Sequence, residues 1–117
     1  MAGGVAEDGG EGTAIVEIRT TFADRDRAAA CAEVLVRDRL AACVQIDGPV
    51  GSTYAWQGAV ETAAEWRCTC KTTPGRAEAC RRAIAAVHPY QTPEIVSSTA
   101  EGSAAYAAWV RASVGDA

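Results

Sequence analysis

The order in which strand-like and helix-like hydrophobic patterns follow one another limits the fold of this chain more than any other feature of its sequence. Apolar and polar residues alternate over residues 14–19, which is typical of a strand. Residues 25–39 repeat apolar side chains three and four positions apart, and Asp24 stands directly before them as a helix cap. The chain therefore opens with a strand followed by a helix.

Two long extended runs come next. Residues 40–56 form the first, which Asp47-Gly48-Pro49 interrupts with a turn or bulge signal. Gln57-Gly58 then separates it from a second extended run over 59–73. A two-residue break of this kind between two strands predicts a hairpin.

The remaining elements complete the order. Residues 76–87 carry apolar side chains at helical spacing, residues 93–97 form a short last strand, and Ser103 opens a C-terminal helix. This order is β-α-β-β-α-β with one added helix. It predicts an α+β fold, a ferredoxin-like sandwich with an extra C-terminal helix.

The N-terminal residues differ from this pattern in composition. Residues 1–12 hold five glycines and three acidic residues around a single valine, so they lack the apolar surface needed for packing. We expect a disordered tail over 1–12 and a single domain over 13–113.

The supply of bulky apolar side chains is small. Hydrophobic residues make up 49% of the chain, but 26 of them are alanines. Two helices are expected to cover one face of the sheet. The other face is left to the large aromatic residues of the hairpin, Tyr54, Trp56 and Trp66. These residues either pack against a neighbouring subunit or line a ligand cleft. We therefore expect a homo-oligomer.

The charge and the hydropathy of the chain each argue against one class of partner. The formal net charge is −4, whereas a protein that binds a nucleic-acid backbone is normally basic. The sequence has no run of 18 or more apolar residues and an acidic N-terminus, so we expect neither a membrane span nor a secretion signal. These features predict a cytoplasmic protein that binds neither nucleic acid nor membrane.

The five cysteines lie in apolar or alternating segments, which favours reduced, buried thiols. Cys68 and Cys70 share one strand face, so a dithiolate metal site is the alternative to core packing. Cys31 and Cys80 occupy the apolar stripes of the helices and Cys43 starts an apolar strand, so we expect all three to be small core residues. An enzyme that uses Cys43 or Cys68 as a nucleophile with His88 is a further alternative, although burial would make such a thiol inert.

Two single residues stand out as candidates for polar chemistry. His88 is the only histidine and follows a helix C-terminus, where it is either a ligand or a residue that satisfies local carbonyls. Lys71 is the only lysine, and we expect it to form an ion pair with Glu65 or Glu94.

Three strings together resemble the CutA family, the divalent-cation-tolerance proteins. They are residues 39–44 (RLAACV), 52–58 (STYAWQG) and 88–95 (HPYQTPEI). The resemblance implies a trimer with edge-to-edge sheet contacts, similar in architecture to the P-II nitrogen-signalling proteins. It also implies a role in tolerance of copper or other divalent metals, without enzymatic activity.

The resemblance also implies a site. The positions of the family's copper ligands, a cysteine and two histidines, correspond here to Thr20, Val87 and His88, so only His88 remains and we expect weak binding of Cu2+ or another divalent cation there. The cleft between subunits is expected to use five further residues: Trp56, Glu65, Lys71, Tyr90 and Glu94. The alternative function is a P-II-like module that binds a small ligand without a metal.

Overall fold

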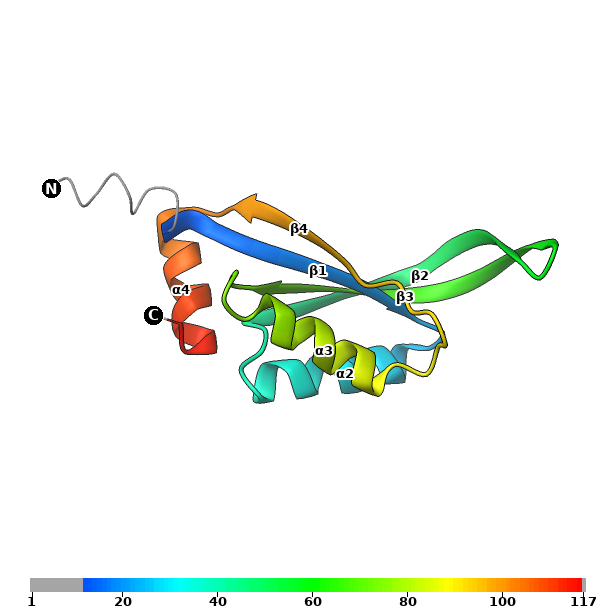
Figure 1. Cartoon of the computed structure of the whole chain (residues 1–117), viewed down its shortest axis with the longest axis horizontal. Coiled ribbons are helices and arrows are strands. Elements are labelled where there is room, and N and C mark those ends of the chain that lie inside the picture. The colour runs from blue at the N-terminus through cyan, green and yellow to red at the C-terminus, as the bar shows by residue number, and fades with distance from the viewer. Residues whose placement is uncertain (1–11, 117) are drawn as a thin grey trace, which may run out of the picture.

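The computed structural model of the chain describes residues 12–116, so the predicted N-terminal tail lies outside the described residues except for Gly12. These residues form a four-stranded sheet and three helices (Figure 1). In chain order the elements are β1 (Ala14–Phe22), α2 (Arg25–Arg37), β2 (Cys43–Trp56), β3 (Ala59–Thr72), α3 (Ala77–Val87), β4 (Val96–Glu101) and α4 (Ala104–Val114). The predicted ferredoxin-like order with an extra C-terminal helix is confirmed.

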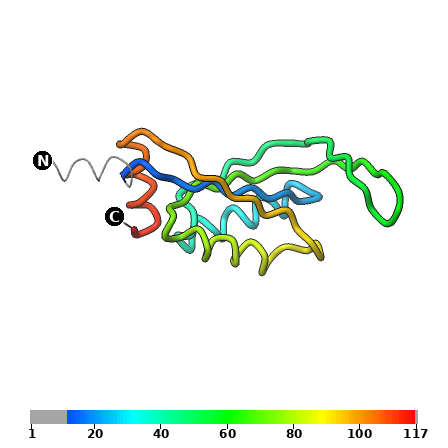
Figure 2. Tube along the Cα trace, turned by 45° about the horizontal axis from the view of Figure 1, so that its top comes forward, coloured from blue at the N-terminus to red at the C-terminus, as the bar shows by residue number. Residues whose placement is uncertain are grey.

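The sheet is antiparallel throughout, with the strand order β2-β3-β1-β4. Helices α2 and α3 lie side by side on one of its faces, as Figures 1 and 2 show. The main core lies between these helices and the sheet and includes Ile18, Phe22, Leu35 and Ile84. Strands β2 and β4 form the two edges of the sheet.

The ends of α2 follow from local chemistry. Asp24 is the N-cap, as predicted: its carboxylate accepts a hydrogen bond of 2.8 Å from the backbone N–H of Arg27. The helix ends at Arg37 and not at Arg39 as predicted. Arg39 takes a φ of 60°, and the chain turns there because the amides of Asp38 and Leu40 bond back to the carbonyls of Val34 and Leu35.

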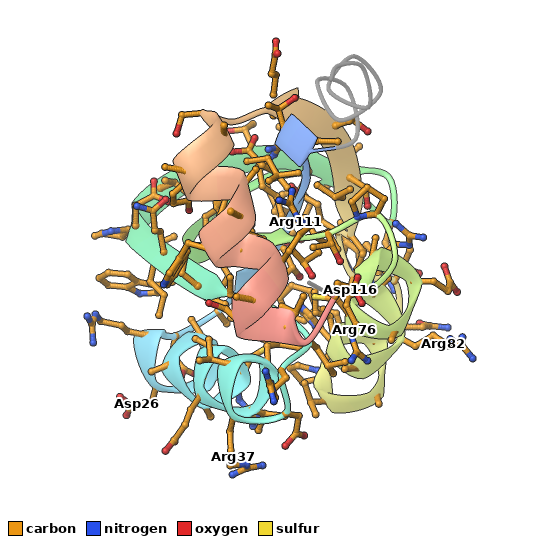
Figure 3. The ribbon with its side chains drawn as sticks, turned by 90° about the vertical axis from the view of Figure 1, so that its left-hand side faces the viewer. Asp26, Arg37, Arg76, Arg82, Arg111 and Asp116 are labelled. Carbon is orange, nitrogen blue, oxygen red and sulfur yellow. The ribbon has the colours of Figure 1, made fainter. Side chains whose placement is uncertain are left out.

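Helix α4 packs at the end of the sheet where β1 begins. Its buried Ala107, Val110 and Val114 form a second, smaller core with Ile15 and Ala42. Ser103 caps its start, as predicted. Arg76, directly before α3, and Arg39, in the α2–β2 loop, donate hydrogen bonds to backbone carbonyls at its C-terminal end, where Figure 3 shows Arg76 beside Asp116.

Strands β2 and β3 form a hairpin that extends well beyond the rest of the molecule (Figures 1 and 2). Its turn residues Gln57 and Gly58 have φ angles of 50° and 81°, as a two-residue hairpin turn requires. A register shift between Asp47 and Val50 confirms the predicted bulge. Gly48 lies there because a Cβ atom would come within 2.7 Å of the Trp66 ring.

Two expectations about the sheet are wrong. Strand β4 begins at Val96 and not at Pro93, which lacks the N–H that a strand pairing needs. Trp66 does not lie on the free face, because it packs against the main core under the helices. The face away from α2 and α3 carries charged and polar side chains from three strands, among them Glu17, Arg19, Gln45, Arg67 and Lys71.

Candidate functional site

The imidazole ring of His88 lies where α3 ends and the connection to β4 begins. Its Nε2 is 2.7 Å from the backbone carbonyl oxygen of Thr21, and the backbone N–H of Tyr90 donates to its Nδ1 at 3.3 Å. The ring stacks on Phe22 with a centroid distance of 4.3 Å and an interplanar angle of 12°. The last two residues of β1 therefore hold the ring in place.

These contacts define the protonation state of His88. A carbonyl oxygen only accepts hydrogen bonds, so Nε2 carries the proton, and Nδ1 is the acceptor for the Tyr90 N–H. Burial lowers the pKa of His88, although the Thr21 carbonyl and the Glu65 carboxylate act in the opposite direction. Both ring nitrogens are therefore in hydrogen bonds, and the lowered pKa favours the neutral ring at neutral pH.

Tyr90 connects this ring to the base of the hairpin. Its hydroxyl donates a hydrogen bond of 2.9 Å to the Glu65 carboxylate, and its ring lies 4.8 Å from the His88 ring, centroid to centroid. Burial and the bond to Glu65 raise the pKa of Tyr90 to about 12. We call Phe22, Glu65, His88 and Tyr90 the His88 cluster.

The other predicted cleft residues lie elsewhere in the chain. Trp56 stands next to the hairpin turn and is 50% exposed. Glu94 is exposed. The hydrogen bond to Asp47 raises the pKa of Arg67, and the negative charge of Glu94 adds to this effect. Of the predicted cleft residues, the structure thus brings only Glu65 and Tyr90 together with His88.

Lys71 also lies away from the His88 cluster. Its Nζ lies 3.8 Å from the carboxylate of Glu17 and donates to the Gln45 side chain at 3.3 Å. The predicted ion pair with Glu65 or Glu94 is wrong. Glu17 lies directly opposite Lys71 in the β1–β3 pairing, whereas Glu65 is six residues back along the same strand, roughly 20 Å away.

The residues present do not fit a copper site. The Thr20 side chain is fully buried, and its hydroxyl has no hydrogen-bond partner among the described residues. Val87 offers no donor atom, and both nitrogens of His88 are already used. Within residues 12–116 no group of three or more His, Cys, Asp or Glu side chains is arranged to hold a metal ion.

Four of the five cysteines are buried in the main core, as predicted, and all five are unpaired. Burial raises the pKa of Cys31 to about 12 and that of Cys68 to about 11. A hydrogen bond to Cys80 raises the pKa of Cys70 further. Cys68 and Cys70 share a face, but thiols with such pKa values are inert at neutral pH.

Cys43 differs from the other four, and the prediction that it is a core residue is wrong. It is half-buried, and its Sγ lies 3.6 Å from the Tyr106 hydroxyl. Cys43 lies opposite Lys71 on β3, and Lys71 lies opposite Glu17 on β1. His88 instead contacts Thr21, which is four residues and roughly 13 Å farther along β1 than Glu17. Cys43 and His88 therefore do not form the thiol–imidazole pair that an enzyme of that class needs.

Sequence reasoning missed two contacts of His88. Phe22 is the only phenylalanine in the chain and lies three residues beyond the strand pattern of residues 14–19, so that pattern did not indicate it as a partner for the imidazole. Thr21 contributes its backbone carbonyl, and every residue has one, so no signal in the sequence identifies it.

The comparisons agree with this architecture. Residues 16–113 match the profile of the family described as CutA1 divalent ion tolerance protein. The Divalent-cation tolerance protein CutA of Thermus thermophilus is 38% identical over 96 residues, which cover 81% of this chain and 93% of that protein.

Solved structures give the same result. CutA from Xylella fastidiosa superposes with a TM-score of 0.83 at 34% identity, covering 86% of this chain and 97% of that one. The periplasmic divalent cation tolerance protein CutA from Archaeoglobus fulgidus gives 0.81 at 31% identity, covering 86% and 98%. Among the described residues no helix is long and apolar enough to cross a membrane.

Proposed function

The chain belongs to the CutA1 divalent ion tolerance family, and we propose that it is a non-enzymatic homotrimer that binds a ligand in clefts between its subunits. The ligand is a divalent cation such as Cu2+, bound away from the His88 position, or a small molecule. Its physiological role is tolerance of divalent cations.

One observation carries the proposal: the predicted cleft residues lie at three separate places in one chain. Trp56 is near the hairpin turn, Lys71 is at the far end of β3, and Tyr90 is with Glu65 in the His88 cluster. A cleft that contains all of them forms only where one copy meets another. The cleft hypothesis therefore requires association.

The hairpin and the sheet edges supply the means of association. Tyr54, Trp56 and Val60 are exposed by 42%, 50% and 77% on an arm that the other described residues leave uncovered. Strands β2 and β4 present open edges to solvent. Edge pairing between copies satisfies the free backbone groups and buries the aromatic arm.

The cellular compartment is part of the proposal. We place the protein in the cytoplasm, where five unpaired thiols remain reduced. A relative from Archaeoglobus fulgidus is described as periplasmic, so cell fractionation with an antibody against this chain is the direct test.

The experiment for assembly compares two tryptophans. Trp56 on the arm and Trp109 on α4 are 50% and 49% exposed, so Trp56→Ser and Trp109→Ser remove the same side chain from equally accessible positions. Light scattering on a sizing column should give a trimer for the natural chain and for Trp109→Ser, and a smaller species for Trp56→Ser. A natural chain that is monomeric at about micromolar concentration contradicts the proposal.

A P-II-like module that binds a small ligand without a metal is the second candidate. The hydrogen bonds on both ring nitrogens of His88 favour it, because they leave no lone pair for a metal. Equilibrium dialysis of the trimer against Cu2+ and, separately, against a mixture of small anionic metabolites separates the two candidates.

A further inference from the structure

The His88 ring makes more directed contacts than a residue that merely ends a helix needs. One nitrogen is bonded to β1, the other accepts from the α3–β4 connection, and the ring face lies flat on Phe22. Each contact restrains a different motion of the ring. The two bonds fix rotation within its plane, and the stacking fixes its tilt.

We propose that His88 is a positioning residue, held as the Nε2–H tautomer between the end of β1 and Tyr90, and that it is not a metal ligand in this chain. The inference does not depend on the proposed trimer, since all the contacts that support it lie within one subunit. The family resemblance implies a metal site at Thr20, Val87 and His88, and on this proposal the chain does not form that site.

Neither nitrogen of the ring can bind a metal without losing a hydrogen bond. A metal on Nε2 has to remove its proton and leaves the Thr21 carbonyl, 2.7 Å away, without a donor. A metal on Nδ1 displaces the backbone N–H of Tyr90. The ring cannot turn to avoid these losses without giving up its stacking on Phe22.

The co-ligands are missing as well. A single imidazole binds copper weakly, and tight sites combine several nitrogen or sulfur donors. The neighbouring family positions hold a hydroxyl that is fully buried at Thr20 and an aliphatic side chain at Val87. Nothing among the described residues compensates for the hydrogen bonds that a metal at His88 would break.

The ring instead sets the position of Tyr90. The Tyr90 amide is bonded to Nδ1, and the hydroxyl of the same residue donates to Glu65 on β3. His88 thus connects the end of β1 through Tyr90 to the base of the hairpin. Its effect on Glu65 passes through Tyr90, since His88 itself makes no hydrogen bond to that carboxylate.

The first experiment reads the tautomer directly. His88 is the only histidine, so a sample labelled with ¹⁵N-histidine gives a single pair of ring nitrogen signals. In the natural chain at neutral pH, Nε2 should carry the proton and Nδ1 should show the shift of an acceptor. The Nδ1–H tautomer, or rapid exchange between the two, overturns the proposal without the need for any variant.

The second experiment uses variants that each keep one half of the ring's hydrogen bonding. His88→Asn places an oxygen near the position of Nδ1, His88→Gln places an amide nitrogen near that of Nε2, and His88→Ala keeps neither. Hydrogen exchange of the Tyr90 amide should be protected in the natural chain and in the Asn variant, and faster by about tenfold or more in the Ala variant. Equal exchange in the natural chain and the Ala variant, while other core amides stay protected, contradicts the positioning role.

The third experiment is a titration with Cu2+ alone. The natural chain and His88→Asn should bind Cu2+ equally, within about twofold, and the Nδ1 signal of the natural chain should not broaden selectively at low copper concentrations. A loss of affinity of about tenfold or more in His88→Asn shows that His88 is a ligand and overturns the proposal. Failure of the trimer in the scattering experiment leaves all three readouts unchanged, so the two proposals fail independently.

Discussion

The carboxylate of Asp116 accepts a hydrogen bond of 2.5 Å from the hydroxyl of Thr73, 43 residues away in the chain. The same Thr73 oxygen accepts from the N–H of Arg76, and α3 has no cap of its own from the side chain of Arg76. The segment after α4 therefore supplies an anion at the start of α3, where the helix dipole favours negative charge.

We predict that Asp116→Ala lowers the free energy of unfolding by about 1 kcal/mol, the size of a lost helix cap. The ion pair of Asp116 with Arg76 is partly exposed and adds little to this value. Asp38→Ala is the control, because it removes an exposed pair with Arg37 and should change stability by less than about 0.5 kcal/mol. Urea unfolding measures both, and equal effects would rule out the cap.

Arg39 gives a second prediction, because it combines useful bonds with an unfavourable backbone. Its side chain donates to the carbonyls of Ser113 and Ala112, but its φ of 60° lies in the left-handed region. Arg39→Ala and Arg39→Gly lose the same bonds, whereas glycine alone relieves the backbone. The Gly variant should be more stable than the Ala variant by about 1 kcal/mol in urea unfolding. The reverse order would contradict this account of the turn.

The thiols give a third prediction. Cys43 is the half-buried one, and burial holds the pKa of Cys31 at about 12 and of Cys68 at about 11. A thiol reagent should therefore modify at most one cysteine rapidly in the native protein, and Cys43→Ser should abolish that phase. After unfolding, all five should react. Fast native modification of two or more would show that at least one of the four core cysteines is accessible.

A fourth prediction concerns pH. Burial lowers the pKa of folded His88 below 6.5, so the unfolded chain binds the proton more readily. The stability that His88 contributes is therefore complete above about pH 6.5 and is lost as pH falls toward the folded pKa. The urea midpoint of the natural chain should fall across this range more steeply than that of His88→Asn. Parallel curves would show that His88 does not titrate in this range.

Local sequence signals predicted the elements well, because the relevant interactions lie within a few residues. Asp24 and Ser103 cap their helices as expected, and Gln57-Gly58 forms the hairpin turn. Arg39 shows the limit of such signals. Its side chain bonds to carbonyls at the end of α4, and no helical periodicity near residue 39 reports a partner so distant in the chain.

The candidate site was predicted less completely. His88, Glu65 and Tyr90 were predicted as site residues without their arrangement, and Lys71 was assigned to the wrong carboxylate. The pairing register between β1 and β3 decides that Lys71 faces Glu17. Register results from packing of the whole sheet, so a side chain's neighbour across two strands cannot be read from either strand alone.

The sequence by itself determined the order of strands and helices, the hairpin and the burial of most of the cysteines, since hydrophobic period and turn chemistry are properties of short segments. Only the tertiary structure decided what His88 does. Its partner is a backbone carbonyl on β1, 67 residues away, and that group is chemically the same at every position of the chain. The fold alone brings the carbonyl of Thr21 to the ring, and this contact makes His88 a hydrogen-bond donor at the nitrogen where a metal ligand would need a free lone pair.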